Sequence, residues 1–235
     1  MSNKLSPLGG FFIGLGLVVA GFLLAKALID FKQMERTVTA KGLAEQEVVA
    51  DTAIFPIRFS SGSNQLSDLH QTLKQQSNII QDFLLAQGFS KEEITTGAPT
   101  IVDKQAQQYG GAQQGFRYTA TATINVYTKS VDKVVNARKK LLDLTSKGIV
   151  IAGNDYQARV EFIFTKLNDL KPKMIEQATN NARQVAQKFA QDSNSTLGKL
   201  RKARQGQFSI SDRDSNTPHI KKIRIVSTLE YYLAD

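Results

Sequence analysis

The sequence predicts an α+β fold with a mainly antiparallel sheet, preceded by an N-terminal transmembrane helix. Two observations lead to this prediction: an apolar run at residues 8–29, and a later chain in which alternating strands are interleaved with amphipathic helices. Strands in which apolar and polar residues alternate have one face in water, which is typical of antiparallel sheets. A parallel sheet covered on both faces would instead show continuous apolar runs.

The apolar run reads LGGFFIGLGLVVAGFLLAKALI, and no charged residue occurs between Lys4 and Lys26. A helix needs roughly 20 mainly apolar residues to cross a hydrocarbon core of about 30 Å. Lys26 is compatible with such a helix if its ammonium group extends to the head-group layer. We therefore expect a tail at 1–7, a transmembrane anchor at 8–29, a linker at 30–36 and one α+β domain at 37–235.

Two alternatives to a retained anchor remain for this run. Ala25 and Ala27 fit the small-residue pattern of a signal-peptide cleavage site, although the apolar part is longer than a usual signal sequence. A buried core helix is less compatible, since no other segment of the chain is equally apolar. If the helix is retained, Gly10 and Gly14 form a GxxxG motif through which two such helices can pack closely.

Composition limits the chemistry of the chain. An apolar fraction of 41% is typical of a globular protein. The absence of cysteine excludes disulfides, zinc–thiolate sites and cysteine nucleophiles. The net charge of +9, with a pI near 9.6, favours an anionic partner or surface.

Period-2 alternation and turn residues divide the later chain into strands and helices. We expect a strand that enters a bend at Gly42, and a second in which Pro56 indicates an edge or a bulge. The expected strands are 37–43, 47–60, 92–103, 116–128, 149–151, 157–164, 196–211 and 220–233. Polar loops are expected at 105–115 and 212–218.

Three helices are expected from apolar residues at helical spacing. The first begins near Leu66 after a cap at Ser63 or Asn64 and ends at Gly88. The second extends from a cap at Ser130 to about Lys147, before Gly148. The third extends over 171–192, with Pro172 in its first turn. Alanines at 178, 182, 186 and 190 make one side of the third helix smooth enough for another backbone to approach closely.

The stretch VTAKGLAEQEVVADTAIFPIRF resembles the opening of SIMPL-domain proteins, bacterial envelope proteins that include the periplasmic immunogenic protein and proteins named for oxidative-stress defence. Gly42, Asp51 and Ala53 stand where that family has a glycine, an aspartate and an alanine, whereas Ala50 replaces its frequent proline. The segments GFSKEEITTGAPTI, GFRYTATATINVYT and ATNNARQVAQKFA follow in family order. The resemblance implies repeated β-α-β-β units, an envelope location and, in some members, ring assembly. It implies no catalytic residue.

Two observations predict opposite sides of the membrane for the domain. Lys26, Lys32 and Arg36 follow the apolar run, and cytoplasmic flanks usually carry more Lys and Arg. The resemblance instead implies a location outside the cytoplasm, and long domains are translocated regardless of flanking charge. We therefore expect a single-pass protein of the bacterial inner membrane with a periplasmic domain.

Few residues are candidates for chemistry. His70 and His219 have no second histidine nearby in sequence, so a packing or surface role fits them better than metal binding. Asp212 and Asp214 lack the twelve-residue calcium-loop pattern and fit a solvated turn. Asp51 is the best carboxylate for a hydrolase, but a strand-entry residue that binds backbone N–H groups explains it better. We expect no catalytic residue, cofactor or metal.

Basic residues near the C-terminus form the one patch that predicts a contact. If the last strands pair, the patch can attract anionic phospholipid or another envelope polyanion, or it can protect an exposed sheet edge. Nucleic acid is not expected, since no aromatic residues are interleaved there. The members of this patch are Lys199, Arg201, Lys202, Arg204, Lys221, Lys222 and Arg224.

These observations predict a membrane-anchored, non-catalytic structural or interaction protein of the envelope that forms homo-oligomers, with a link to envelope or oxidative stress through the resemblance. A module that binds or senses a small molecule between sheet and helices is the first alternative. A hydrolase that uses Asp51 is the second alternative.

Overall fold

The structure is a computed structural model that describes residues 7–33, 36–106, 115–151 and 158–234. It confirms an α+β fold with an N-terminal apolar helix and antiparallel strand pairing. The chain divides into two compact units. Unit 1 comprises Met1–Gln46, Leu170–Ser209 and Arg224–Asp235, and unit 2 comprises Glu47–Asp169 and Ile210–Ile223.

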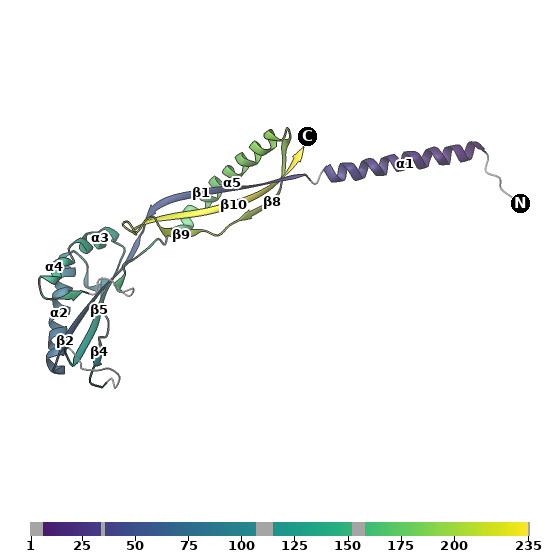
Figure 1. The fold of residues 1–235 in the computed structure, drawn as a ribbon. Helices are drawn as coiled ribbons and strands as arrows, with labels where there is room; N and C mark the ends of the chain where they lie inside the picture. The colour runs from purple at the N-terminus through teal and green to yellow at the C-terminus, as the bar shows by residue number, and fades with distance from the viewer. Residues whose placement is uncertain (1–6, 34–35, 107–114, 152–157, 235) are drawn as a thin grey trace. The chain divides into compact units, whose positions relative to one another are not determined.

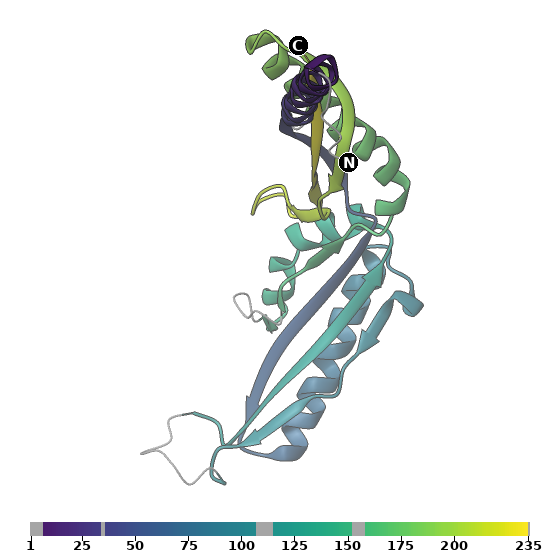
Figure 2. The same ribbon diagram turned by 90° about the vertical axis from the view of Figure 1, so that its right-hand side faces the viewer.

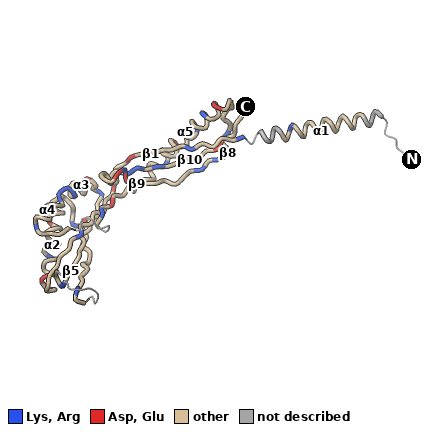
Figure 3. Tube along the Cα trace, in the orientation of Figure 1, with Lys and Arg blue, Asp and Glu red and all other residues tan. Residues whose placement is uncertain are grey.

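The N-terminal helix α1 spans Pro7–Gln33 and therefore extends into the expected linker. Its window Phe11–Leu28 is long and apolar enough to cross a membrane, and none of its side chains is buried in the protein. Lys26 is the one charged residue of this window, and Figure 3 shows most of the window in the colour of uncharged residues. At a rise of 1.5 Å per residue, the window alone is about 27 Å long, close to the thickness of a hydrocarbon core.

Unit 1 is a sheet with helix α5 (Leu167–Asp192) along one face (Figures 1 and 2). The strand order is β1-β10-β8, and β9 also pairs with β10. Its core is small and contains Ala40, Ala182, Ala186, Leu229 and Tyr231. The bounds are Thr37–Val49 for β1, Thr196–Gln205 for β8, Ser209–Asp212 for β9 and Ile220–Ala234 for β10.

The expected bend at Gly42 is wrong, because β1 continues through this residue. Gly42 is required for close packing instead. A Cβ atom at this position would lie 1.9 Å from the carbonyl oxygen of Ala178 and 2.3 Å from the amide nitrogen of Ala182. The alanine stripe of α5 is buried against the sheet, as its spacing predicts.

Unit 2 is a second antiparallel sheet whose apolar face packs against α2 (Leu66–Ala86) and α3 (Val131–Lys139). The strand order is β3-β5-β2-β6, while β4 pairs with β5 and β7 pairs with β2. The strands are β2 (Thr52–Ser63), β3 (Ile94–Thr96), β4 (Thr100–Asp103), β5 (Tyr118–Thr128), β6 (Val150–Ile151) and β7 (Glu161–Ile163). The 3-10 turn η1 (Lys91–Glu93) and the short helix α4 (Leu142–Thr145) complete it.

Several expected strand boundaries need correction. The expected strand 47–60 is two strands, since β1 ends at Val49 and β2 begins at Thr52. Pro56 is not on an edge strand, because β2 pairs with β5 on one side and with β6 and β7 on the other. The pairings with β7 and β6 involve residues 52–54 and 59–60, so Pro56 lies between them. Most of the expected loop 105–115 lies outside the described residues.

The helix boundaries also differ from expectation. The predicted helix 130–147 is divided into α3 and α4, and Ser130 makes no side-chain cap. The cap residue of α2 is Gln65, not Ser63 or Asn64. Helix α5 begins four residues earlier than expected, so Pro172 lies beyond its first turn. Gly88 and Gly148 have positive φ angles of 86° and 77°, which explains why they end helices.

Candidate functional site

The carboxylate of Asp51 anchors the segment that leads into α5. Its Oδ2 accepts hydrogen bonds from the backbone N–H groups of Thr165 (2.9 Å) and Lys166 (3.3 Å). Its Oδ1 accepts from the hydroxyls of Thr52 (2.9 Å) and Thr165 (3.0 Å). Both oxygens are therefore engaged in unit 2, and the residue binds backbone N–H groups as its position after β1 predicts.

The pKa of Asp51 is lowered from its ordinary value. Partial burial acts to raise this pKa, but the hydrogen bonds from Thr165, Thr52 and Lys166 together outweigh burial. Hydrogen bonds to a carboxylate favour its charged form and so lower its pKa. A general acid at neutral pH needs a raised pKa, so these contacts fit a structural role and not proton donation.

The basic residues of β8 lie on an edge strand of the unit 1 sheet. Strand β8 pairs antiparallel with β10, so that Lys202 lies beside Glu230 and Arg204 beside Thr228. Neither Lys202 nor Arg204 forms an ion pair with a described residue. Together with Thr39, Thr228 and Glu230 they line a hollow of about 170 Å³.

This hollow opens on the sheet face opposite α5. In β10 the buried residues have odd numbers, such as Leu229 and Tyr231, and face the helix, so Thr228 and Glu230 face the other way. Successive side chains of a strand point to opposite faces, which places Thr39 of β1 on the same outer face. Among the described residues, the outer face thus presents two cations without an ion-pair partner, Lys202 and Arg204, beside the carboxylate of Glu230.

Two other members of the basic patch meet at a bulged part of β8. Pairing with β10 shifts between Glu230 and Tyr231 and again before Leu233, each time with one additional residue in β8. Arg201 lies at the first shift and forms an ion pair with Glu230 at 2.9 Å. Its guanidinium lies 5.7 Å from the ring centre of Tyr232. Lys199 lies at the second shift and is exposed.

The basic residues of β10 do not join those of β8. The register places Arg204 beside Thr228, four residues beyond Arg224, or roughly 13 Å along the strand. Lys221 is buried and forms an ion pair with Asp212, so it is not available to an anionic surface. Arg224 forms an ion pair with Glu45 at 3.4 Å, and the side chain of Lys222 also has an interaction partner.

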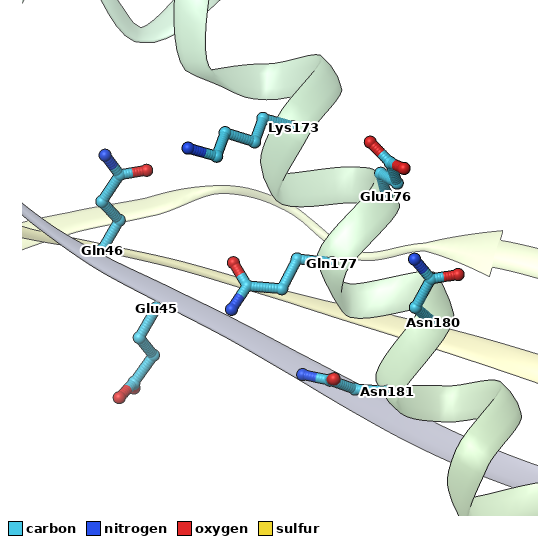
Figure 4. A pocket seen from close by; sticks show the side chains of 7 residues that line it. All are labelled: Glu45, Gln46, Lys173, Glu176, Gln177, Asn180 and Asn181. Atoms are coloured by element: carbon cyan, nitrogen blue, oxygen red, sulfur yellow. The ribbon is translucent and has the colours of Figure 1, made fainter.

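An open polar groove of about 600 Å³ lies between β1 and α5 in unit 1. Figure 4 shows Gln46 and Lys173 pointing toward one another across it, with the amide of Gln177 between helix and strand. The carboxylate of Glu45 points away from the helix. The amide of Asn181 donates a hydrogen bond of 2.8 Å to the carbonyl oxygen of Leu43. The lining residues are Glu45, Gln46, Lys173, Glu176, Gln177, Asn180 and Asn181.

Sequence reasoning did not find this groove. Gln177, Asn180 and Asn181 follow helical i, i+3, i+4 spacing, so their position on one helix face was available from the sequence. The sequence could not show that these residues lie near Gln46, because that depends on how β1 packs across α5.

The histidines and the remaining acidic candidates occupy separate places. His70 is exposed on α2, while the ring of His219 contacts Phe162 edge to face at 5.9 Å. Asp214 accepts hydrogen bonds from the backbone of Asn216 and Thr217, as expected for a turn. The hydroxyl of Thr217 and the guanidinium of Arg213 further lower the pKa of Asp214. In the described part of the chain, no cluster of three His, Asp or Glu is arranged to hold a metal ion.

One family model matches most of the sequence that forms the two units. This model covers residues 38–222 and is that of SIMPL, described as a protein of unknown function. The chain belongs to the SIMPL family. The match confirms the resemblance noted in the sequence, and no curated protein matches the chain.

The match places the SIMPL domain after α1 and includes most of both units. Because the family is described as one of unknown function, the match assigns no catalytic residue. Three features of the SIMPL domain are therefore candidates for a functional site. They are the hollow beside Lys202, the polar groove between β1 and α5 (called the amide groove below), and the end of the unit 1 sheet at which β1 begins after α1.

Proposed function

We propose that this SIMPL protein is a membrane-anchored, non-catalytic interaction protein of the bacterial cell envelope. Helix α1 crosses the inner membrane once, and the SIMPL domain lies on the periplasmic side. The observation that carries the proposal is the apolar window Phe11–Leu28, in which Lys26 is the one charged residue and which precedes a folded domain after a short connection. The four hydrogen bonds to Asp51 support the absence of catalysis, since they occupy the best candidate carboxylate.

Extraction of membranes with alkaline carbonate, combined with a topology reporter fused after Asp235, tests the anchor and its side. We expect the intact protein to stay in the membrane pellet, and the reporter to be active only in the periplasm. Release of the protein by carbonate contradicts the anchor, and so does a mature form that begins at Leu28. A reporter active only in the cytoplasm contradicts the proposed side.

Homo-oligomerisation through α1 is part of the proposal. Gly10 and Gly14 lie in this helix, and a Cβ atom at Gly14 would have no neighbour within 4 Å, so a second helix has space to approach. Light scattering of the detergent-extracted protein should show an oligomer that Gly14→Ile weakens. Gly21→Ile, at an equally open position in α1, is the matched control. A monomer at all concentrations contradicts this part.

A role in envelope or oxidative stress rests on the family resemblance alone. We expect cells that lack the protein to grow more poorly than the parent strain under peroxide or detergent stress. Equal growth of the two strains contradicts the stress link and leaves the anchoring proposal unaffected.

Binding of a small polar ligand in the amide groove is the second candidate function. The amide side chains of Gln46, Gln177 and Asn180 supply both donors and acceptors, which suits an uncharged ligand with several hydroxyl groups. A thermal-shift screen of sugars and polyols tests it. A stabilising compound should lose its effect in Gln177→Ala but not in Gln184→Ala, about two turns farther along α5. Absence of any stabiliser contradicts a ligand of this class.

A further inference from the structure

We propose that the end of unit 1 at which β1 begins lies on the head-group layer of the bilayer that α1 crosses, and binds anionic lipid head groups there. This proximal end is defined by Arg36, Phe189, Lys199, Arg201 and Tyr232. The inference rests on the proposed anchoring of α1, and it adds a second, surface contact between the protein and the membrane.

Chain length brings this end to the membrane. The apolar window ends at Leu28, and α1 continues to Gln33, which adds about 7.5 Å along the helix axis. The head-group region of one leaflet is roughly 5 to 8 Å thick, so Gln33 reaches its outer boundary. Three further residues lead to Arg36, which cannot lie more than about 11 Å away.

Hydrogen bonds join three separate chain segments at this end. The backbone N–H of Leu233, near the end of β10, donates to the carbonyl oxygen of Arg36 at 2.8 Å. The guanidinium of Arg36 donates to the hydroxyl of Ser195 at 3.2 Å, in the turn between α5 and β8. The end of β10, the end of α5 and the start of β8 are therefore fixed beside the start of β1.

The exposed side chains of the proximal end have the chemistry of a membrane interface. Phe189 and Tyr232 are 55% and 39% exposed. Tyrosine is enriched at head-group level in membrane proteins, and phenylalanine is common on the apolar face of helices that lie in the interface. Arg201 stacks on Tyr232, and the exposed Lys199 lies two residues before it in β8.

Two acidic groups among the described residues of this end form ion pairs with cations. Asp192 forms an ion pair with Lys188 at 2.6 Å, and Glu230 forms one with Arg201 at 2.9 Å. Lys199 forms no ion pair with a described residue, so its positive charge is available to the lipid surface. Anionic lipid attracts a cation that lies within a Debye length, about 8 Å, of the membrane surface.

A single tryptophan provides the test, because the native chain has none. The full chain carrying Phe189→Trp is reconstituted in vesicles whose lipids bear bromine near the head groups, with phosphatidylglycerol or with phosphatidylcholine alone. We expect at least a twofold loss of fluorescence in brominated phosphatidylglycerol vesicles relative to unbrominated ones, and a smaller loss in phosphatidylcholine.

Two control positions separate the possible failures. Phe12→Trp lies within the apolar window of α1, and Leu43→Trp lies on β1 about 20 Å beyond Thr37. Phe12→Trp is measured in a second set of vesicles, whose lipids carry bromine on the acyl chains. If its fluorescence is not quenched there, the proposed anchoring by α1 is wrong. If Phe12→Trp is quenched but Phe189→Trp is not, the anchor stands and the proximal contact is overturned. Equal quenching of Leu43→Trp and Phe189→Trp also overturns it, because the contact would then not belong to this end.

Charge reversal completes the test. In the Phe189→Trp chain, Lys199→Glu should remove most of the difference between the two lipid compositions. Lys139→Glu, an identical change on α3 of unit 2, should leave that difference unchanged. An equal effect of both substitutions would show a response to net charge only and would overturn a head-group site at the proximal end.

Discussion

Gly42 of β1 and Ala182 of α5 lie so close that their backbones leave no room for a side chain between them. A Cβ atom at Gly42 would lie 2.3 Å from the amide nitrogen of Ala182 and 1.9 Å from the carbonyl oxygen of Ala178. Both neighbours are backbone atoms, so no rotamer change relieves the overlap. The strand has to move away from the helix, and the small alanine core of unit 1 opens with it.

We therefore expect Gly42→Ala to destabilise unit 1 by about 2 to 3 kcal/mol, at the upper end for overpacking in a core. Urea unfolding followed by circular dichroism measures the change. Gly62→Ala is the matched control, because the three atoms nearest its new methyl group belong to the side chain of Phe116, which is half exposed and can shift toward solvent. Equal losses in the two variants would contradict this account of the strand–helix contact.

Replacement of Asp51 by Asn should lower the free energy of unfolding by about 1 kcal/mol at neutral pH, as for the loss of a helix cap. An amide offers one acceptor oxygen where the carboxylate offers two. Its NH₂ group also meets donors from Thr165 or Thr52. Asp82→Asn, at an exposed position on α2, is the control and should change stability little.

The effect of Asp51 should also depend on pH, with a defined sign. Because the folded-state pKa of Asp51 is lowered, its stabilising contribution is fully present above the unfolded pKa of about 3.9. That contribution is lost as pH falls through the folded-state value. The stability gap between native protein and Asp51→Asn should therefore be constant above about pH 5 and narrow below pH 4. A gap that widens in acid would contradict this assignment.

We expect the ion pair between Lys221 and Asp212 to stabilise the fold and not to bind a partner. Removal of the carboxylate in Asp212→Ala leaves the buried ammonium of Lys221 without this partner, at a cost of about 2 to 4 kcal/mol. Lys221→Met in the same chain should restore most of the loss, because no buried charge remains. A double-mutant cycle measured by thermal unfolding tests this. Additive losses would contradict the coupling.

Lys202 and Arg204, the two cations that line the hollow on the outer sheet face, should determine the affinity of the protein for soluble polyanions. Replacing Lys202 and Arg204 by Gln should make the protein elute from a heparin column at lower salt than the native chain. The control Lys139→Gln with Lys140→Gln removes the same charge from the α3 region. If both double variants elute alike, net charge explains the binding and the hollow does not. The difference should disappear in high salt, where exposed charges are screened.

The sequence pattern predicted those features that depend on local periodicity. The alanine stripe of α5 and the alternating strand β5 are found where expected, because side-chain burial follows helical and strand spacing directly. Gly42 was placed in a bend because glycine permits turns. Its actual role depends on Ala178 and Ala182, well over a hundred residues later, and no local pattern contains that contact.

For the basic patch, too, the sequence could not predict which residues come together in space. That β8 and β10 pair could be predicted, but the register could not, and the register separates Arg204 from Arg224. Lys221 looks like any other surface lysine in sequence. Its burial follows from its pairing with Asp212, nine residues earlier, across a loop whose conformation depends on hydrogen bonds to Asp214.

The central place of β10 in the unit 1 sheet has a consequence for biosynthesis. Strand β1 emerges from the ribosome early, yet among the described strands its sheet neighbour is β10, which is translated roughly 170 residues later. Until then, β1 exposes unpaired backbone groups, and such edges promote aggregation. A nascent chain of this protein therefore exposes an unpaired strand until β10 is made, and a ribosome that stalls before residue 220 releases a product that cannot complete the sheet.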